Sequence, residues 1–184
     1  YQESLAEVKK NPGKYSYASP GNGSITHLMM EMFKLSTGTD ITHVPYRGSG
    51  PALNDAVAGQ VPLIFDNLPS ALEQSRGGTV RALGVTSPQR WPALPDVPAI
   101  AETVPGFESV GFYGISPPKG TPGDIVELLN KTVNEALKDP KVVARLTENG
   151  GIPKPMTPAE FGKLVADETD KWRKVVEFAG VSVD

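Results

Sequence analysis

Short apolar segments of strand length alternate with segments of helical periodicity through the first half of the sequence. This alternation is typical of α/β proteins, in which each helix connects two parallel strands. The segment Val61–Phe65 is a continuous apolar run, which indicates a strand covered on both faces. The pattern predicts a doubly wound, mainly parallel sheet with helices on both faces, and its expected strands are Tyr15–Ser19, Ile41–Tyr46, Val61–Phe65 and Val80–Thr86.

Helical periodicity fills the intervals between these strands and dominates the second half of the chain. One further strand is expected at Val110–Ser116, before a mostly helical region whose longer helices carry an apolar stripe on one face. The expected helices are a short one around Leu5 and Val8, one from Ile25 to Leu35 that Gly38 ends, Leu53–Val57, a helix up to Arg76 with Ser70 as its N-cap, Ala99–Val104, Asp124–Leu137, Lys141–Leu146 and Pro158–Ala179.

Composition narrows the class of protein. Of the 184 residues, 39 % are hydrophobic and 21 % are charged, as in an ordinary packed protein, and the net charge is −3. A nucleic-acid-binding protein needs a basic surface to neutralise phosphates, so we expect no nucleic-acid partner. Because the sequence has no cysteine, disulfides, thiolate metal sites and cysteine nucleophiles are excluded.

Two glycine-rich loops, each between an expected strand and an expected helix, are the most informative part of the sequence. In a parallel sheet such loops lie at the carboxyl ends of the strands, where ligands bind. Their glycines allow close approach of the backbone, and the helix N-termini after them favour a carboxylate or a phosphate. The alternative is a pair of tight turns with ordinary caps. The candidate ligand-binding residues are Ser19, Gly21, Asn22, Gly23 and Ser24 in the first loop and Tyr46, Arg47 and Gly48 in the second.

Sequence patterns for nucleotide binding, hydrolysis and metal coordination are incomplete. Thr26 stands where the dinucleotide fingerprint has its third glycine, and the sequence has neither a P-loop nor a nucleophile elbow. A hydrolase built on Ser24, His27 and Asp66 would lack that elbow, since Ser24 and His27 share one helical turn. His27 and His43 have no companion histidine, so we expect neither a metal site nor a cofactor.

Two charged residues near the loops have two interpretations each. Asp66 ends an apolar strand at the expected ligand edge of the sheet, where it either caps the turn Asn67–Ser70 or contacts a ligand. Arg47 either clamps a carboxylate or is a solvated cation of the loop. We include both residues among the candidates for ligand binding.

An ordered set of short motifs runs through nearly the whole chain. The set comprises Ser4-Leu5-Ala6-Glu7, Asn11-Pro12-Gly13-Lys14, the loop Ala18–Ser24, His27-Leu28, His43–Ala52, Gly59-Gln60-Val61, Phe65–Ser70, Arg81–Thr86, Leu94–Pro98, Pro117 and Gly120-Thr121-Pro122. Each motif is weak by itself. The ordered set resembles the substrate-binding proteins of tripartite tricarboxylate transporters, the Bug-type periplasmic solute receptors.

The resemblance implies a receptor without catalytic activity. Its fold would be that of a type II periplasmic binding protein, a clamp of two lobes with a small carboxylated ligand between them. The ligand would pass from the receptor to the permease subunits of a membrane transporter, and the receptor would be periplasmic. The resemblance also implies that the residues of both loops face the cleft, with Asp66 nearby. Contacts through ordered water would serve there at little cost in affinity.

The resemblance also predicts a domain organisation. Family members begin with a strand and a Pro/Gly-rich loop, and this chain opens at Tyr1 without them and without a secretory leader. We expect 4–107 to form lobe two, the ligand-binding α/β domain, and 108–184 to form the C-terminal portion of lobe one, whose N-terminal half lies outside the chain.

The apolar stripes of the C-terminal portion then need another partner. We expect them to pack on a second copy of the chain, through Glu108–Asp184, or on lobe two of the same chain. Two functions remain as alternatives to a receptor. One is a small α/β hydrolase or phosphate-handling enzyme, and the other is a protein–protein interaction module.

Overall fold

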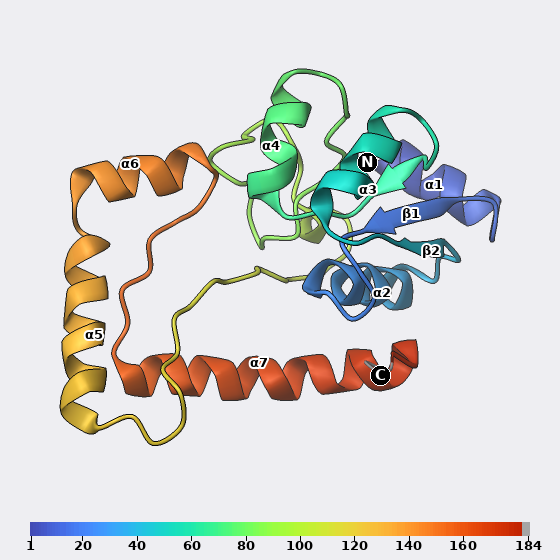
Figure 1. Cartoon of the computed structure of the whole chain (residues 1–184). Coiled ribbons are helices and arrows are strands. Elements are labelled where there is room, and N and C mark those ends of the chain that lie inside the picture. The colour runs from blue at the N-terminus through green and yellow to red at the C-terminus, as the bar shows by residue number, and fades with distance from the viewer. Residues whose placement is uncertain (182–184) are drawn as a thin grey trace. The chain divides into compact units, whose positions relative to one another are not determined.

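A three-stranded parallel sheet organises the first half of the computed structural model, which describes residues 1–181 (Figure 1). Strand β1 (Ser16–Ser19) lies between β2 (Thr42–Pro45) and β3 (Leu63–Ile64) and is parallel to both. Ala18 is in register with Val44 on one side and with Ile64 on the other. The three strands therefore end at the same edge, and the loops that follow them are neighbours.

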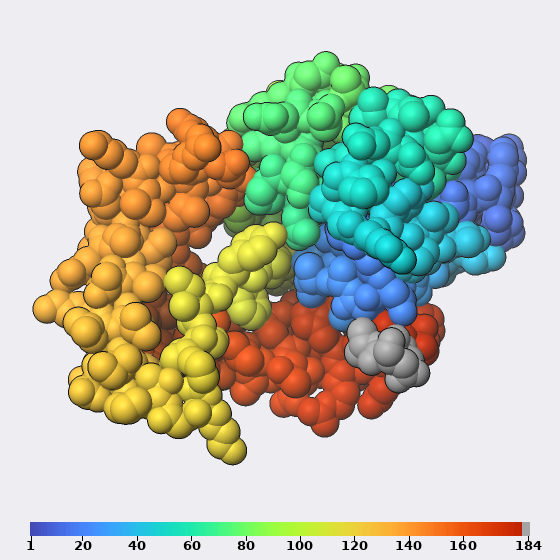
Figure 2. Space-filling model, viewed as in Figure 1, coloured from blue at the N-terminus to red at the C-terminus, as the bar shows by residue number. Residues whose placement is uncertain are grey.

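Helices cover both faces of this sheet. Because side chains alternate along β1, successive residues of this strand enter a different core on each face. Tyr17 packs in one core with Val8 of α1 (Gln2–Lys10) and Phe33 of α2 (Ile25–Thr37). The next residue, Ala18, packs in a second core with Ala52 of α3 (Ser49–Val57). Helix α3 also contacts α4 (Leu68–Arg76), and Figure 2 shows the surfaces of these two helices side by side. The predicted doubly wound sheet is confirmed.

Local signals place the ends of several helices. Helix α2 ends at Gly38 in the left-handed conformation, as predicted. It begins after Ser24, whose side chain caps it. The prediction that Ser70 is an N-cap is wrong, because α4 begins at Leu68 with Asn67 as its N-cap. The helix expected at Ala99–Val104 is reduced to a 3-10 turn, η1 (Ile100–Glu102).

Two of the expected strands do not form within the described residues. In Val80–Thr86 only Val85 pairs, through an isolated parallel bridge to Ala99. Val110–Ser116 forms no strand, and Tyr113 and Ile115 are exposed. An alternating sequence favours extended backbone, whereas a strand also needs a partner for its hydrogen bonds.

The chain divides into two compact units. The sheet unit comprises Tyr1–Gly111 and the chain from Val175 onward, and the helical unit comprises Phe112–Lys174. The helical unit contains α5 (Gly123–Ala136), α6 (Pro140–Glu148) and most of α7 (Pro158–Ala179). No helix among the described residues is long and apolar enough to cross a membrane.

Side-chain contacts hold the helical unit together locally. The side-chain amides of Asn130 and Asn134 on α5 both donate to the carbonyl of Met156, at 2.8 and 2.9 Å. The rings of Phe112 and Phe161 pack edge to face, with centroids 6.0 Å apart. These contacts tie the extended segments of the unit to α5 and α7.

Candidate ligand-binding site

The two candidate loops meet at the carboxyl edge of the sheet, as predicted. The backbone N–H of Tyr46 donates to the carbonyl of Ser19 at 3.0 Å, and that of Gly48 donates to the carbonyl of Pro20 at 2.8 Å. A Cβ atom on Gly21 would lie 3.3 Å from the Tyr46 carbonyl oxygen, so the backbones are in close approach. Glycine at this position allows the two loops to share one surface.

Hydrogen bonds within the first loop fix its shape. The Ser24 hydroxyl donates to the Gly21 carbonyl at 2.7 Å and accepts from the backbone N–H of His27 at 3.3 Å. Gly23 has a φ of 71°, a left-handed conformation that favours glycine. Ser19 is fully buried and Asn22 is exposed. The loop is therefore a preformed turn before the N-terminus of α2, where backbone N–H groups favour an anion.

The second loop combines an exposed cation with anchored neighbours. The hydroxyl of Tyr46 donates to Asp55 of α3 at 2.8 Å, and this bond raises the pKa of Tyr46 above its usual range. Arg47 is exposed, and Gly48 is the N-cap of α3. The N-termini of α2 and α3 thus begin at adjoining loops, which gives the edge two positive helix ends.

Asp66 lies in the loop that follows β3. Because β3 lies next to β1 rather than next to β2, the strand order changes direction here, which makes this edge the switch point of the sheet. Asp66 Oδ1 accepts hydrogen bonds from the Ser49 hydroxyl at 2.7 Å and from the Asn67 backbone N–H at 2.8 Å. Its Oδ2 is buried and has no hydrogen-bond partner among the described residues. Asp66 therefore links the loop after β3 to the start of α3 and retains one oxygen that can accept a further hydrogen bond.

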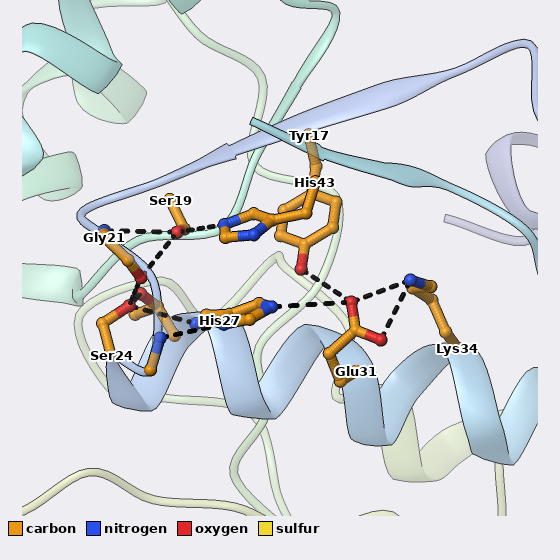
Figure 3. A network of polar contacts seen from close by, with 10 residues as sticks. Tyr17, Ser19, Gly21, Ser24, His27, Glu31, Lys34 and His43 are labelled. Carbon is orange, nitrogen blue, oxygen red and sulfur yellow. Dashed lines mark hydrogen bonds and ion pairs between the residues drawn. The ribbon is translucent and has the colours of Figure 1, made fainter. Parts of the chain in front are cut away.

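A buried polar network adjoins the first loop (Figure 3). The rings of His27 and His43 stack with centroids 3.8 Å apart and planes 11° apart. The Nδ1 atom of His27 accepts from the backbone N–H of Gly23 at 3.1 Å, and the Nε2 atom of His43 lies 2.6 Å from the Ser19 hydroxyl oxygen. The two rings therefore contact both ends of the first loop.

The other end of this network is a buried carboxylate. Glu31 Oε1 accepts from the Tyr17 hydroxyl at 3.0 Å, and both carboxylate oxygens accept from Lys34, at 2.7 and 2.9 Å. The Nε2 atom of His27 lies 3.8 Å from Glu31 Oε1. Burial, with a contribution from Glu31, raises the pKa of Tyr17, so the phenol stays protonated.

The same burial acts on both histidines in the opposite direction. It is the main cause of the lowered pKa of His27, where the Glu31 carboxylate partly compensates. Burial together with repulsion from His27 lowers the pKa of His43 to about 4. Both rings are therefore neutral near pH 7.

The expectation that the two histidines lack a companion is wrong. Helix α2 carries His27 back across the face of the sheet, and β2 brings His43 against it beside β1. The sequence did hold one signal, because His27 lies in the first turn after β1 and His43 lies on the strand expected to pair with β1. The hydrolase arrangement is not assembled, since Ser24 bonds the backbone of His27 rather than its ring.

Cavities lie elsewhere in the sheet unit. One of about 410 Å³ is lined by Tyr1, Arg90 and Glu102, among others, and one of about 200 Å³ is lined by residues that include Val8 and Tyr15. Neither cavity is lined by a candidate ligand-binding residue.

Comparison with known proteins identifies the family. The family model described as the tripartite tricarboxylate transporter family receptor, TctC, matches residues 1–181. A protein from the tcbD–tcbE intergenic region of Pseudomonas sp. strain P51 is 41 % identical over 174 residues, which are 94 % of this chain and 52 % of that protein. Protein BugT of Bordetella pertussis is 38 % identical over 180 residues, or 97 % of this chain and 55 % of BugT. The chain thus spans about half the length of these relatives.

Solved structures give the same result. A structure described as a periplasmic transporter is 47 % identical, with a TM-score of 0.91, and the match covers 100 % of this chain and 62 % of that one. A Rhodopseudomonas palustris protein with adipate is 37 % identical, with a TM-score of 0.91 and coverage of 98 % and 61 %. MatC from the same species, with bound malate, is 34 % identical, with a TM-score of 0.84 and coverage of 95 % and 61 %. The chain therefore belongs to the TctC family of tripartite tricarboxylate transporter receptors.

Proposed function

We propose that the protein containing this chain is a solute-binding receptor, and that the two adjoining loops form its side of a site for a small carboxylate. The observation that carries the proposal is the meeting of both loops, and of two helix N-termini, at one edge of a parallel sheet. The adipate and malate in the two R. palustris structures indicate the class of ligand.

Each candidate residue has a chemical role in this proposal. The positive N-terminal ends of helices α2 and α3 stabilise the ligand's negative charge. Arg47 supplies an exposed cation in the second loop, where its guanidinium can pair with a carboxylate. The unpartnered oxygen of Asp66 accepts from a ligand hydroxyl or from an ordered water that bridges to the ligand.

The remaining parts of the proposal come from the family. A receptor of this family hands its ligand to the permease subunits of a tripartite transporter, and the site is periplasmic. We also propose that residues 4–107 correspond to lobe two of the clamp and residues 108–184 to the C-terminal portion of lobe one. The ligand would then lie between this sheet edge and the other lobe.

A thermal-shift screen tests the proposal. The full-length protein that contains this sequence is heated with a panel of small mono-, di- and tricarboxylates that includes malate and adipate. Adipamide, which keeps the carbon chain of adipate but lacks its charge, is the matched control, and inorganic phosphate is the anion control. We expect at least one carboxylate to raise the melting temperature in a concentration-dependent way, without turnover. Stabilisation by phosphate and by no carboxylate would favour a phosphate-handling protein instead.

A further inference from the structure

The first loop is held at both of its ends by an aromatic stack of two histidines (Figure 3). At one end, His27 Nδ1 takes the N–H of Gly23. At the other end, His43 Nε2 contacts the Ser19 hydroxyl, which in turn accepts from the N–H of Gly21 at 3.3 Å. Both contacts reach the backbone of the loop that would carry the ligand, although neither ring belongs to the set of candidate ligand-binding residues.

Only a neutral ring can make the contact to Gly23. An imidazole nitrogen accepts a hydrogen bond only when it carries no proton, so the Gly23 N–H fixes the proton of His27 on Nε2, on the side of Glu31. Protonation at Nδ1 would place two donors face to face and would break this bond. The stack adds a second constraint, because two positive rings with centroids 3.8 Å apart repel each other.

We propose that His27 and His43 are positioning residues that hold the first loop in its ligand-binding geometry only while both rings are neutral. The role of the loop in this inference rests on the proposed function. Protonation of the pair releases Gly23, so acid weakens carboxylate binding at this site.

The surroundings of the pair support this behaviour. Burial keeps the pKa of each ring below its ordinary value, so both are neutral near pH 7. The charged or titratable groups that face the pair are Tyr17 from β1 and Glu31 and Lys34 from α2. Glu31 favours a proton on His27 and Lys34 disfavours it, and Glu31 is already paired with Lys34. His27 is therefore neutral near pH 7. When it takes up a proton, the Glu31 carboxylate is the neighbouring group that stabilises the charged ring.

The wild-type full-length protein and two variants of it distinguish the hydrogen bond from His27 to Gly23 from simple packing of the ring. His27→Phe keeps the ring and the stack but removes the acceptor for Gly23. His27→Asn removes the ring but places an amide oxygen near the position of Nδ1, and this acceptor does not titrate. The affinity for malate and adipate is measured by calorimetry between about pH 7.5 and about pH 4.5, because burial lowers the pKa of both rings below the ordinary histidine value. Because the ligand also takes up protons as the pH falls, each pH effect is taken relative to His27→Asn.

We expect His27→Phe to bind about tenfold more weakly than the wild type near pH 7.5, because Gly23 has lost a buried acceptor. His27→Asn should restore most of that affinity. Relative to His27→Asn, the wild type should lose affinity by up to about a further tenfold towards about pH 4.5. Equal binding by His27→Phe and the wild type, or equal pH dependence in the wild type and His27→Asn, would overturn the inference.

A readout without ligand keeps this test separate from the proposed function. Hydrogen exchange at the Gly23 amide, followed by NMR, should be slow in the wild type at about pH 7.5 and at least about tenfold faster in His27→Phe. If the wild type binds no carboxylate, the proposed function fails, while the exchange rate still tests whether His27 holds the loop. Equal protection of Gly23 in both proteins would show that it does not.

Discussion

The sheet unit and the helical unit bury their apolar side chains to very different extents. In the sheet unit, Tyr17 and Ala18 are fully buried between helices that cover both faces. In the helical unit, no residue of α5 or α6 is buried, and Leu128 and Leu129 are 60 % and 45 % exposed. Both units have amphipathic sequences. The comparison shows that an amphipathic pattern predicts which face of a helix needs an apolar partner, but not which part of the protein supplies that partner.

The apolar stripes of the helical unit are unevenly covered. Leu128 and Leu129 are exposed, whereas Trp172 and Val176 of α7 are partly buried. Packing of the stripes against a second copy of the chain, or against lobe two of the same chain, stays a prediction.

The largest expected effect is self-association of the 184-residue chain. Four exposed apolar side chains, at roughly 1.5–3 kcal/mol each, represent at most about 6–12 kcal/mol of burial free energy; they are Ile125, Leu128, Leu129 and Val165. Light scattering at micromolar concentration should give the mass of a dimer or larger species. Replacing both Leu128 and Leu129 by Glu should lower that mass, whereas Leu35→Glu on exposed α2 surface should not. A monodisperse wild-type monomer would contradict this prediction.

A core truncation should distinguish the two units by several kcal/mol. Phe33 is buried and packs edge to face against Tyr1 and Phe107, so Phe33→Ala should lower the free energy of unfolding by about 3–5 kcal/mol. Ile152 of the helical unit is 60 % exposed, and Ile152→Ala should cost less than about 1 kcal/mol. Urea denaturation followed by circular dichroism measures both. Equal losses would mean that the two units are equally packed.

A tight contact inside the helical unit gives a smaller effect. A Cβ atom on Gly114 would overlap the ring of Phe161, so the ring must move in Gly114→Ala, at a cost of at most about 1–3 kcal/mol. Gly123 at the start of α5 has open space around it, and Gly123→Ala should be neutral or stabilising by less than about 1 kcal/mol. Thermal unfolding of the two variants compares them, and an NMR shift of the Phe161 ring should appear only in Gly114→Ala. An unperturbed ring would disprove the contact.

The smallest expected effect per pH unit is a histidine-dependent change in the stability of the sheet unit, which holds both histidines of the sequence. The ordinary histidine pKa is 6.5, and the folded pKa of His43 is lowered to about 4. Between these values the unfolded chain binds more protons than the folded chain, so the stability of the sheet unit falls as the pH falls. The slope is at most about 1.4 kcal/mol per pH unit for each ring.

Unit-specific hydrogen exchange between about pH 7 and about pH 4.5 measures this dependence. The double variant with His27→Asn and His43→Gln should flatten it, because neither amide titrates. The helical unit has no histidine, and its exchange-derived stability should change less over this range. An unchanged slope in the double variant would assign the effect to other groups.

The sequence predicted those parts of the fold whose signals are local or pairwise. The parallel strands near Ser16, Thr42 and Leu63, the Gly38 terminus and the adjoining loops all follow from periodicity and turn residues. The strand expected at Val80–Thr86 is wrong because its neighbour, near Ala99, pairs at only one residue. The strand propensity of a segment depends on that segment alone, whereas strand pairing also depends on a second segment that lies beside it.

The candidate site was predicted in position but not in its supporting network. The loops after β1 and β2 could be placed because parallel strands end at one edge. The histidine stack could not, because His27 and His43 meet only through the geometry of the α2 crossover, and Glu31 and Lys34 read as an ordinary surface pair on a helix. The burial of Glu31, which makes this ion pair part of a core network, depends on the tertiary structure.

The most direct test of the central claim compares two glycines in the full-length protein. Gly23 and Gly59 have almost the same left-handed φ, 71° and 72°, so replacement by Val strains the backbone alike at both positions. Only Gly23 lies in the loop proposed to approach the ligand. The affinity for the carboxylate that stabilises the protein most should fall by more than about tenfold in Gly23→Val and stay within about twofold in Gly59→Val. Equal affinities in the two variants would contradict a carboxylate site at these loops.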